Sequence, residues 1–279
     1  MALDAKNRRN LALRVASALV LFPFACWLTY LGGWPFAFLA AAGAAVAAGE
    51  LISMFGTLGV GEAFGVAVAG AIPLMASLGK SGDLLPGWSG LAIAGATMAL
   101  LTSFLFRRMP LDEIPRSLGV VVLSWLYCGL LLAALVGLRL RFGMGWVILA
   151  FVVTWANDTF AYFAGHLFGQ HRMLERISPA KTWEGFAGGM VGSVAGALVT
   201  RWLLLGPELS PDAAAVIGLG GAVLGPLGDL AESMIKRAAG VKDTSRIIPG
   251  HGGLLDRIDA LLFVGPWVYV CAAYLAHVL

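Results

Sequence analysis

The residues with the clearest capacity for chemistry lie between Ser233 and Asp259, in the stretch SMIKRAAGVKDTSRIIPGHGGLLDRID. Only 13% of the whole chain is charged. Yet ionisable side chains crowd into this stretch: Lys236, Arg237, Lys242, Asp243, Arg246, His251, Asp256, Arg257 and Asp259. Lys and Arg neutralise phosphates, and carboxylates supply oxygen ligands for magnesium. The stretch therefore suits an anionic substrate and a metal ion, although a solvated basic loop between membrane helices is the plainer alternative.

Glycines and carboxylates within this stretch refine the interpretation. Gly252 and Gly253 have no Cβ, so backbone N–H groups there can approach an anion closely. Asp256 and Asp259 are spaced to share one face of a helix. Upstream, Asp229 and Glu232 share a face with Ser233 for the same reason. Two helix ends would then bring carboxylates to a divalent cation, unless these acids simply form salt bridges with Lys236, Arg237 and Arg257.

Two further polar segments interrupt the apolar sequence. Asn157 and Asp158 fall inside an apolar run, where a charged group is costly and should face a cavity or a partner. The alternative is that Asp158 forms a hydrogen bond that fixes helix packing. The segment ISPAKTWEG places Ser178, Lys181 and Thr182 before another apolar run. There Lys181 and a helix N-terminus would bind phosphate, or Ser178 and Thr182 would act as caps while Lys181 extends to the interface.

These segments together resemble the CDP-diacylglycerol synthases, also called phosphatidate cytidylyltransferases. The resemblance covers roughly the C-terminal half, including WANDTFAYFAGHLFG, ISPAKTWEG and GDLAES. Its core is a dozen fixed positions, namely Ser233, Lys236, Arg237, Lys242, Asp243, Pro249, His251, Gly252, Gly253, Asp256, Arg257 and Asp259.

The resemblance implies a membrane nucleotidyltransferase of phospholipid biosynthesis that condenses CTP with phosphatidic acid to CDP-diacylglycerol and pyrophosphate. It implies magnesium held by Asp229, Asp256 and Asp259, potassium as a possible second cation, and a homodimer. Catalytic roles fall on Asp229, Asp256, Asp259, Lys236, Lys242 and His251. Substrate-binding roles fall on Asn157, Asp158, Ser178, Lys181, Thr182, Ser233, Arg237, Arg246, Gly252, Gly253 and Arg257.

Composition identifies the elements that must position these residues. Hydrophobic residues make up 59% of the chain and the mean hydropathy is +0.85, well above a soluble domain's apolar share of about 45–50%. Apolar runs of about 20 residues suit membrane-spanning helices. We predict an all-α, polytopic integral membrane protein with about nine transmembrane helices, at 11–31, 34–55, 61–79, 87–106, 117–137, 144–166, 183–206, 213–232 and 259–278.

Basic residues predict the orientation. Most of the 19 Lys and Arg residues fall in loops that share one side if the N-terminus is cytoplasmic. This places the charged stretch on the cytoplasmic face of a bacterial inner membrane. Residues 1–31 resemble a signal peptide in having a basic start and an apolar core. No small-residue cleavage site follows them, so we expect a retained first helix.

We expect a single membrane domain over 1–279, with scaffold helices in 1–140 and the catalytic helices and charged loop in 141–279. The scaffold helices carry almost no charged residues in their interiors, and Glu50 is the exception. Either a position facing a cavity or an interfacial position would explain this acid. Cys26, Cys128 and Cys271 lie singly in apolar runs and receive no role. No basic run with interleaved aromatic residues indicates nucleic acid.

Two other functions remain open. A CTP-dependent polyprenol kinase would transfer a terminal phosphate instead of CMP. An ion- or proton-coupled transporter would use Glu50, Asp158, Asp229 and Glu232 as a path, since intramembrane carboxylates suit that class. Transporters commonly show internally repeated halves, whereas the polar residues here crowd into the second half.

Overall fold

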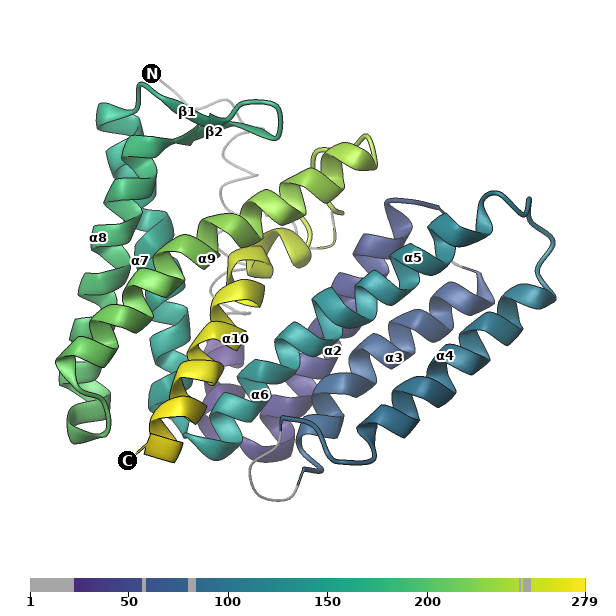
Figure 1. Cartoon of the computed structure of the whole chain (residues 1–279), viewed down its shortest axis with the longest axis horizontal. Coiled ribbons are helices and arrows are strands. Elements are labelled where there is room, and N and C mark those ends of the chain that lie inside the picture. The colour runs from purple at the N-terminus through teal and green to yellow at the C-terminus, as the bar shows by residue number, and fades with distance from the viewer. Residues whose placement is uncertain (1–22, 57–58, 80–83, 246, 248–251, 279) are drawn as a thin grey trace. The chain divides into compact units, whose positions relative to one another are not determined.

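The computed structural model describes residues 23–278 except 57–58, 80–83, 246 and 248–251, and these residues are almost entirely helical (Figure 1). This confirms the predicted helical class. A short antiparallel hairpin of β1 (Arg172–Leu174) and β2 (Ser178–Thr182) is the exception within the described part. The sequence did not reveal it, because strands this short carry too few residues to show an alternating pattern.

The chain divides into two compact units, and the first comprises residues 1–133 and 241–257. Its helices are α2 (Gly33–Ser53), α3 (Val60–Ala76), α4 (Ser89–Leu105), α5 (Ile114–Ser124) and the π-helical turn η1 (Trp125–Leu130). Helix α3 packs against α2, α4, α5 and η1. Small residues permit this packing, since a Cβ on Gly65 would lie 2.5 Å from Val121 and one on Gly70 would lie 3.2 Å from the Ala41 carbonyl oxygen.

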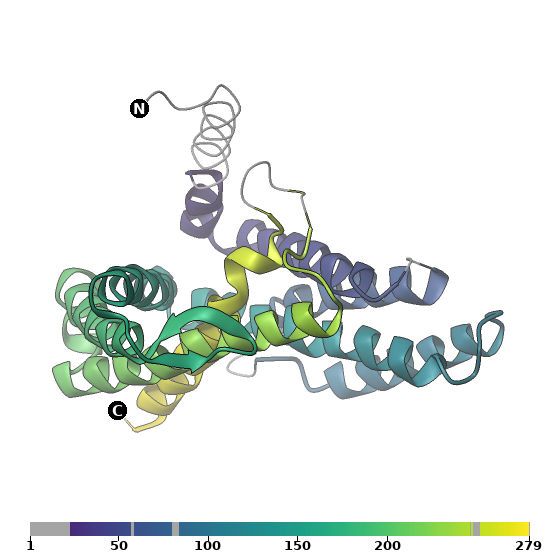
Figure 2. The same cartoon turned by 90° about the horizontal axis from the view of Figure 1, so that it is seen from above.

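The second unit comprises residues 134–240 and 258–279. It contains most of α6 (Leu131–Arg141) and of α10 (Leu255–Val278), with α7 (Met144–Phe168), α8 (Trp183–Thr200), η2 (Arg201–Leu205), η3 (Gly206–Glu208) and α9 (Pro211–Ala238). Helices α7 and α8 lie side by side with the hairpin at one end (Figures 1 and 2), and α9 packs on α8. Gly188 and Gly192 make the close contact possible, because a Cβ on either would meet Phe160 or Ala164 of α7.

Six described helices are long and apolar enough to cross a membrane. They are Gly33–Ser53, Ile114–Arg141, Met144–Phe168, Trp183–Glu208, Pro211–Ala238 and Leu255–Ala276. Val60–Ala76 and Ser89–Leu105 are shorter apolar helices at two further predicted spans. The span predicted at 11–31 lies mostly outside the described residues, although 23–31 are helical.

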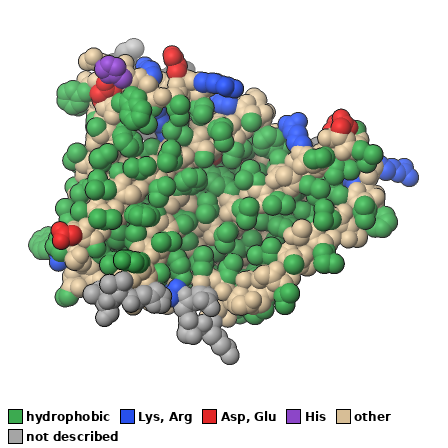
Figure 3. Space-filling view, in the orientation of Figure 1, with side chains coloured by type: hydrophobic (Ala, Val, Ile, Leu, Met, Phe, Trp, Pro, Cys, Tyr) green, Lys and Arg blue, Asp and Glu red, His purple; other side chains and the backbone are tan. Residues whose placement is uncertain are grey.

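Many large apolar side chains are exposed along these helices, including Trp202, Phe106 and Tyr162. Hydrophobic side chains cover most of the face drawn in Figure 3, and charged side chains appear mainly toward its edges. Apolar surface on this scale is costly in water but favourable in lipid. The chain is an integral membrane protein with several membrane-spanning helices. The number nine and the direction of insertion stay predictions.

Candidate active site

A cavity of about 690 Å³ opens in the second unit, beside the hairpin and the helices α7, α8 and α9. Its lining includes six of the residues predicted to bind substrate or metal: Asn157, Asp158, Ser178, Lys181, Thr182 and Asp229. Tyr162, His166 and Arg172 also line it and were not predicted. The sequence offered a signal for Arg172, because it is one of the basic residues between two apolar runs. The volume falls within the range of small-molecule sites.

Lys181 is held at this cavity by the second strand of the hairpin and by contacts with α9, which contains Pro226. Its Nζ lies 2.8 Å from Asp229 Oδ2 and donates a hydrogen bond of 3.0 Å to the Pro226 carbonyl oxygen. Pro226 lacks an N–H, so the Ala222 carbonyl cannot form its usual hydrogen bond within α9. The proline therefore frees a helical carbonyl inside the second unit, where side chains of neighbouring helices can bind it.

Asn157 uses that free carbonyl. Its side chain is 1% exposed, and Nδ2 donates to Ser193 Oγ at 3.1 Å and to the Ala222 oxygen at 3.4 Å. Ser193 Oγ in turn donates to the Val153 oxygen at 3.0 Å. Asn157 thus links α7, α8 and α9, so the structure gives a helix-packing role to Asn157, whereas the sequence analysis had considered such a role for Asp158. The substrate-binding role of Asn157 stays a prediction, as does that of its neighbour Asp158, which lines the cavity.

Thr182 caps α8, since its Oγ1 accepts a hydrogen bond of 3.1 Å from the Gly185 N–H. This confirms one of the two predicted caps. The other was wrong: Ser178 lies in strand β2 and α8 begins only at Trp183, too far along the chain for Ser178 to reach the first turn as its cap. Ser178 instead contributes to the lining of the cavity.

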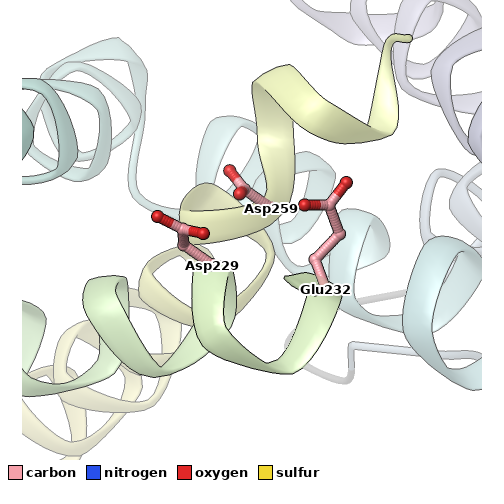
Figure 4. A group of neighbouring side chains, drawn as sticks. All are labelled: Asp229, Glu232 and Asp259. Atoms are coloured by element: carbon pink, nitrogen blue, oxygen red, sulfur yellow. The ribbon is translucent and has the colours of Figure 1, made fainter. Parts of the chain in front are cut away.

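Three carboxylates from α9 and α10 face one another in the second unit (Figure 4). One oxygen from each of Asp229, Glu232 and Asp259 lies within 4.8 Å of the others. Ser233 Oγ donates to Asp229 Oδ1 at 3.2 Å, and Lys236 Nζ lies 2.5 Å from Glu232 Oε2. Hard carboxylate oxygens fit a divalent cation, and two of these three would suffice for magnesium, which is usually bound by one or two carboxylates together with water and phosphate oxygens. The ion pairs of Lys181 and Lys236 show that salt bridges are present as well.

Asp256 belongs to the first unit, where it organises the loop before α10. Its Oδ2 accepts hydrogen bonds from the Thr244 N–H at 3.0 Å, the Thr244 hydroxyl at 2.8 Å and the Gly253 N–H at 3.0 Å. Gly252 has a φ of +82°, which favours glycine. A Cβ on Gly253 would lie 1.9 Å from Thr244 Oγ1. These contacts give both glycines a role in loop packing, and the metal role of Asp256 stays a prediction.

The other predicted residues differ in how the structure places them. Lys236 and Ser233 contact the carboxylates of α9, as described above. Three basic side chains are exposed to solvent, namely Arg237, Lys242 and Arg257. Arg246 and His251 lie outside the described residues, so their predicted roles rest on the sequence.

The sequence analysis did not identify the role of Glu50, which it placed among the scaffold helices. Glu50 lies in α2 and is 2% exposed. Its carboxylate accepts hydrogen bonds from the Ser245 hydroxyl and from the backbone N–H groups of Leu254 and Leu255, and the Thr244 hydroxyl lies 3.3 Å from it. An acid inside an apolar run was the available signal, but its partners lie almost 200 residues away in the charged stretch.

These features define a membrane protein whose helices surround a cavity that carries cations and carboxylates, a combination suited to anionic substrates and a metal. The chain belongs to the cytidylyltransferase family, whose model matches residues 12–275. The match covers nearly the whole chain, including both units and the charged stretch.

Three relatives of this chain from different bacteria carry the same name. A phosphatidate cytidylyltransferase of Brucella abortus biovar 1 is 32% identical over 277 residues, covering 96% of this chain and 95% of the relative. A phosphatidate cytidylyltransferase of Bacillus subtilis is 40% identical over 158 residues, covering 56% of this chain and 58% of the relative. A phosphatidate cytidylyltransferase of Mycobacterium bovis is 42% identical over 128 residues, covering 45% of this chain and 41% of the relative.

Proposed function

We propose that this chain is a phosphatidate cytidylyltransferase, which condenses CTP with phosphatidate to give CDP-diacylglycerol and pyrophosphate. The family match and the names of the relatives support this activity. The structural observation that carries it is the ion pair of Lys181 and Asp229 in the cavity of the second unit, because it combines a phosphate-binding cation with a carboxylate of the acidic cluster.

The reaction needs no covalent intermediate on the protein. An oxygen of the phosphatidate phosphate attacks the α-phosphorus of CTP and forms a new P–O bond. The bond between the α-phosphorus and the bridging oxygen breaks, and pyrophosphate leaves with those electrons. Catalysis then depends on holding two anions together in line and on stabilising the charge of the leaving group.

The cavity and the cluster of Asp229, Glu232 and Asp259, which have Asp229 in common, can do both. Lys181 and Arg172 line it and would offset the repulsion between two phosphate-bearing substrates. Asp229, Glu232 and Asp259 would hold magnesium, which when bound stabilises negative charge on the transferring and leaving phosphates. Potassium as a second cation is part of the proposal through the family resemblance. So are the roles expected of Asp256, Lys236, Lys242, His251 and the predicted substrate-binding residues.

The proposal includes a membrane arrangement. The chain would form one membrane domain of nine spans with a cytoplasmic N-terminus, in a bacterial inner membrane. CTP would reach the site from the cytoplasm and phosphatidate from the bilayer. A homodimer is expected from the family resemblance. Cysteine accessibility at Lys242 and at Arg139, substituted singly in a cysteine-free chain, would test the orientation: labelling from the cytoplasmic side is expected at residue 242 and not at residue 139.

The deciding experiment is the conversion of phosphatidate and CTP labelled at its α-phosphorus into a CMP-bearing lipid by purified protein. Wild type should form CDP-diacylglycerol, and chelation of magnesium should stop the reaction. Asp229→Asn should lose most activity, whereas Asp212→Asn, an exposed acid in the first turn of the same helix, should retain it. Label from the γ-phosphorus on a polyprenol would indicate the kinase instead, and nucleotide-independent ion flux in proteoliposomes would indicate the transporter.

A further inference from the structure

Glu50 holds the loop before α10 through both of its carboxylate oxygens. Oε1 accepts from the Ser245 hydroxyl at 2.6 Å and from the Leu254 N–H at 2.9 Å. Oε2 accepts from the Leu255 N–H at 2.8 Å, and the Thr244 hydroxyl, whose single proton goes to Asp256 Oδ2 at 2.8 Å, lies 3.3 Å from Oε2. Three donors thus converge on the two oxygens, and the Thr244 hydroxyl lies beside them, so most of the accepting capacity of the carboxylate is used. Thr244 and Ser245 come before residues 246–251 in the sequence, and Leu254 and Leu255 come after them.

The same loop holds Asp256. Thr244 provides two of the three donors to Asp256 Oδ2, while its hydroxyl also lies at 3.3 Å from Glu50. Gly253 provides the third donor, and its missing side chain leaves room for Glu50, since a Cβ there would lie 2.8 Å from Glu50 Oε2. Glu50 and Asp256 therefore share Thr244 and the Gly253 turn, so a displacement of Glu50 disturbs the groups that orient Asp256.

An acid buried in an apolar helix is unfavourable unless it is fully hydrogen-bonded. Glu50 is 2% exposed, and its neighbours in α2 are Gly49 and Leu51. The hydrogen bonds to the loop satisfy this carboxylate, so α2 and the loop depend on each other. The N-terminus of α10 is stabilised as well, because the N–H of Leu255, its first residue, and the N–H of the preceding Leu254 donate to Glu50.

We infer that Glu50 is a positioning residue for the reaction: it fixes Thr244, Ser245 and the turn from Gly253 to Leu255 and thereby orients Asp256. The inference rests on the proposed function in one respect, namely that this segment contributes to CMP transfer. Glu50 is not itself assigned a contact with substrate. Its effect is exerted through Thr244, Ser245 and the turn at Gly253.

Glu50→Gln in the full-length protein tests this inference. The amide keeps the size of the side chain but replaces one accepting oxygen with a donor that faces the donors of the loop. The kcat for CMP transfer should fall on the order of 100-fold, the size of effect expected when reacting groups are displaced by about 1 Å. Hydrogen–deuterium exchange should rise in segment 241–257, most clearly at the N–H groups of Leu254 and Leu255.

Glu62→Gln is the matched control, because Glu62 is another buried acid of the first unit, 5% exposed, which pairs with Arg107 and accepts from the Gly59 N–H. It should lower thermal stability yet leave kcat and the exchange of segment 241–257 near wild type. Equal losses of kcat in the two variants would overturn the inference, since Glu50 would then be merely structural. Unchanged exchange at Leu254 and Leu255 in Glu50→Gln would also overturn it.

Ser245→Ala provides a second variant in case Glu50→Gln does not fold, because it leaves α2 intact and removes the shortest donor to Glu50. It should lower kcat about tenfold, the equivalent of one hydrogen bond to a charged group. A kcat equal to wild type would contradict the inference. Should wild type itself fail to transfer CMP, the proposed function falls, whereas the exchange measurements still decide whether Glu50 orders the segment.

Discussion

Lys181 Nζ lies 2.8 Å from Asp229 Oδ2, so the strand β2 and the helix α9 meet through an ion pair at the cavity of the second unit. The Lys181 side chain is 19% exposed and that of Asp229 is 40% exposed, so both groups are accessible from the cavity. An exposed ion pair contributes only about 0–1 kcal/mol to stability. A small contribution to stability fits the roles in substrate and metal binding proposed for Lys181 and Asp229.

Lys181→Met should reduce kcat/KM for CMP transfer by about 100- to 1000-fold, because it removes a cation that offsets the charge of the phosphates. The melting temperature in detergent should change little. Arg176→Met, in the turn of the same hairpin, is the control and should retain activity. Comparable losses in both variants would mean that the basic hairpin acts through its net charge and not through Lys181.

Glu232→Gln should weaken metal binding about 10-fold or more if Glu232 joins Asp229 and Asp259 as a ligand. Binding of Mn²⁺, followed by electron paramagnetic resonance on the purified protein, measures this without an activity assay. Lys236→Met is the control, because it breaks the same ion pair but keeps the carboxylate. Removing that cation should leave Mn²⁺ binding unchanged or tighter. Unaltered Mn²⁺ affinity in Glu232→Gln would exclude it as a ligand.

Asp256→Asn tests whether Asp256 is a metal ligand. The sequence analysis predicted that it is, whereas the cluster of carboxylates in the structure contains Glu232 in its place. The Asp256 carboxylate accepts three hydrogen bonds from the loop at Oδ2, and an amide nitrogen at that position would face donors. We expect CMP transfer to fall at least about 100-fold, as for a misplaced reacting group. The affinity for Mn²⁺ decides the cause of this fall. If Asp256→Asn loses as much Mn²⁺ affinity as Asp259→Asn, Asp256 is a metal ligand as predicted. If its Mn²⁺ affinity equals that of wild type, Asp256 acts by organising the loop.

Gly253→Ala should destabilise the protein by roughly 1–3 kcal/mol, since a Cβ would collide with Thr244 and Glu50. Thermal unfolding in detergent, followed by intrinsic fluorescence, measures the loss. Gly119→Ala in α5 is the control, because a Cβ there has no neighbour within 4 Å among the described residues. A melting temperature for Gly253→Ala equal to that of Gly119→Ala would show that the loop relaxes freely.

Asn157→Leu and Asp158→Asn should separate packing from catalysis at neighbouring positions. Asn157→Leu leaves the buried Ala222 carbonyl without its side-chain donor, which costs about 1–3 kcal/mol. Asp158→Asn alters only a group that lines the cavity, so stability should hold while CMP transfer falls. Thermal unfolding and the labelled-CTP assay on both variants check this. The reverse pattern would assign the packing role to Asp158.

Much of the helical framework could be predicted because hydropathy is a local property of the chain. The span expected at 144–166 corresponds to α7 at Met144–Phe168, and the one expected at 34–55 corresponds to α2 at Gly33–Ser53. Ends were less accurate: α9 runs from Pro211 to Ala238, several residues beyond the predicted 213–232. Its polar final turns contain Glu232 and Lys236, whose charges hid the helix from a hydropathy criterion, although they pair with each other along it.

The residue types of the site were also visible in the sequence, since charges are rare in this chain and costly in a membrane. Lys181, Asp229 and Asp259 were identified in this way, and the charged stretch indicated the family. Only the tertiary structure decided which of them meet. Glu50 joins the loop at Thr244 and Ser245, and Lys181 meets Asp229, through contacts between segments far apart in the chain. Local patterns fix which residues must be buried or paired, whereas the choice of partner depends on how the helices pack.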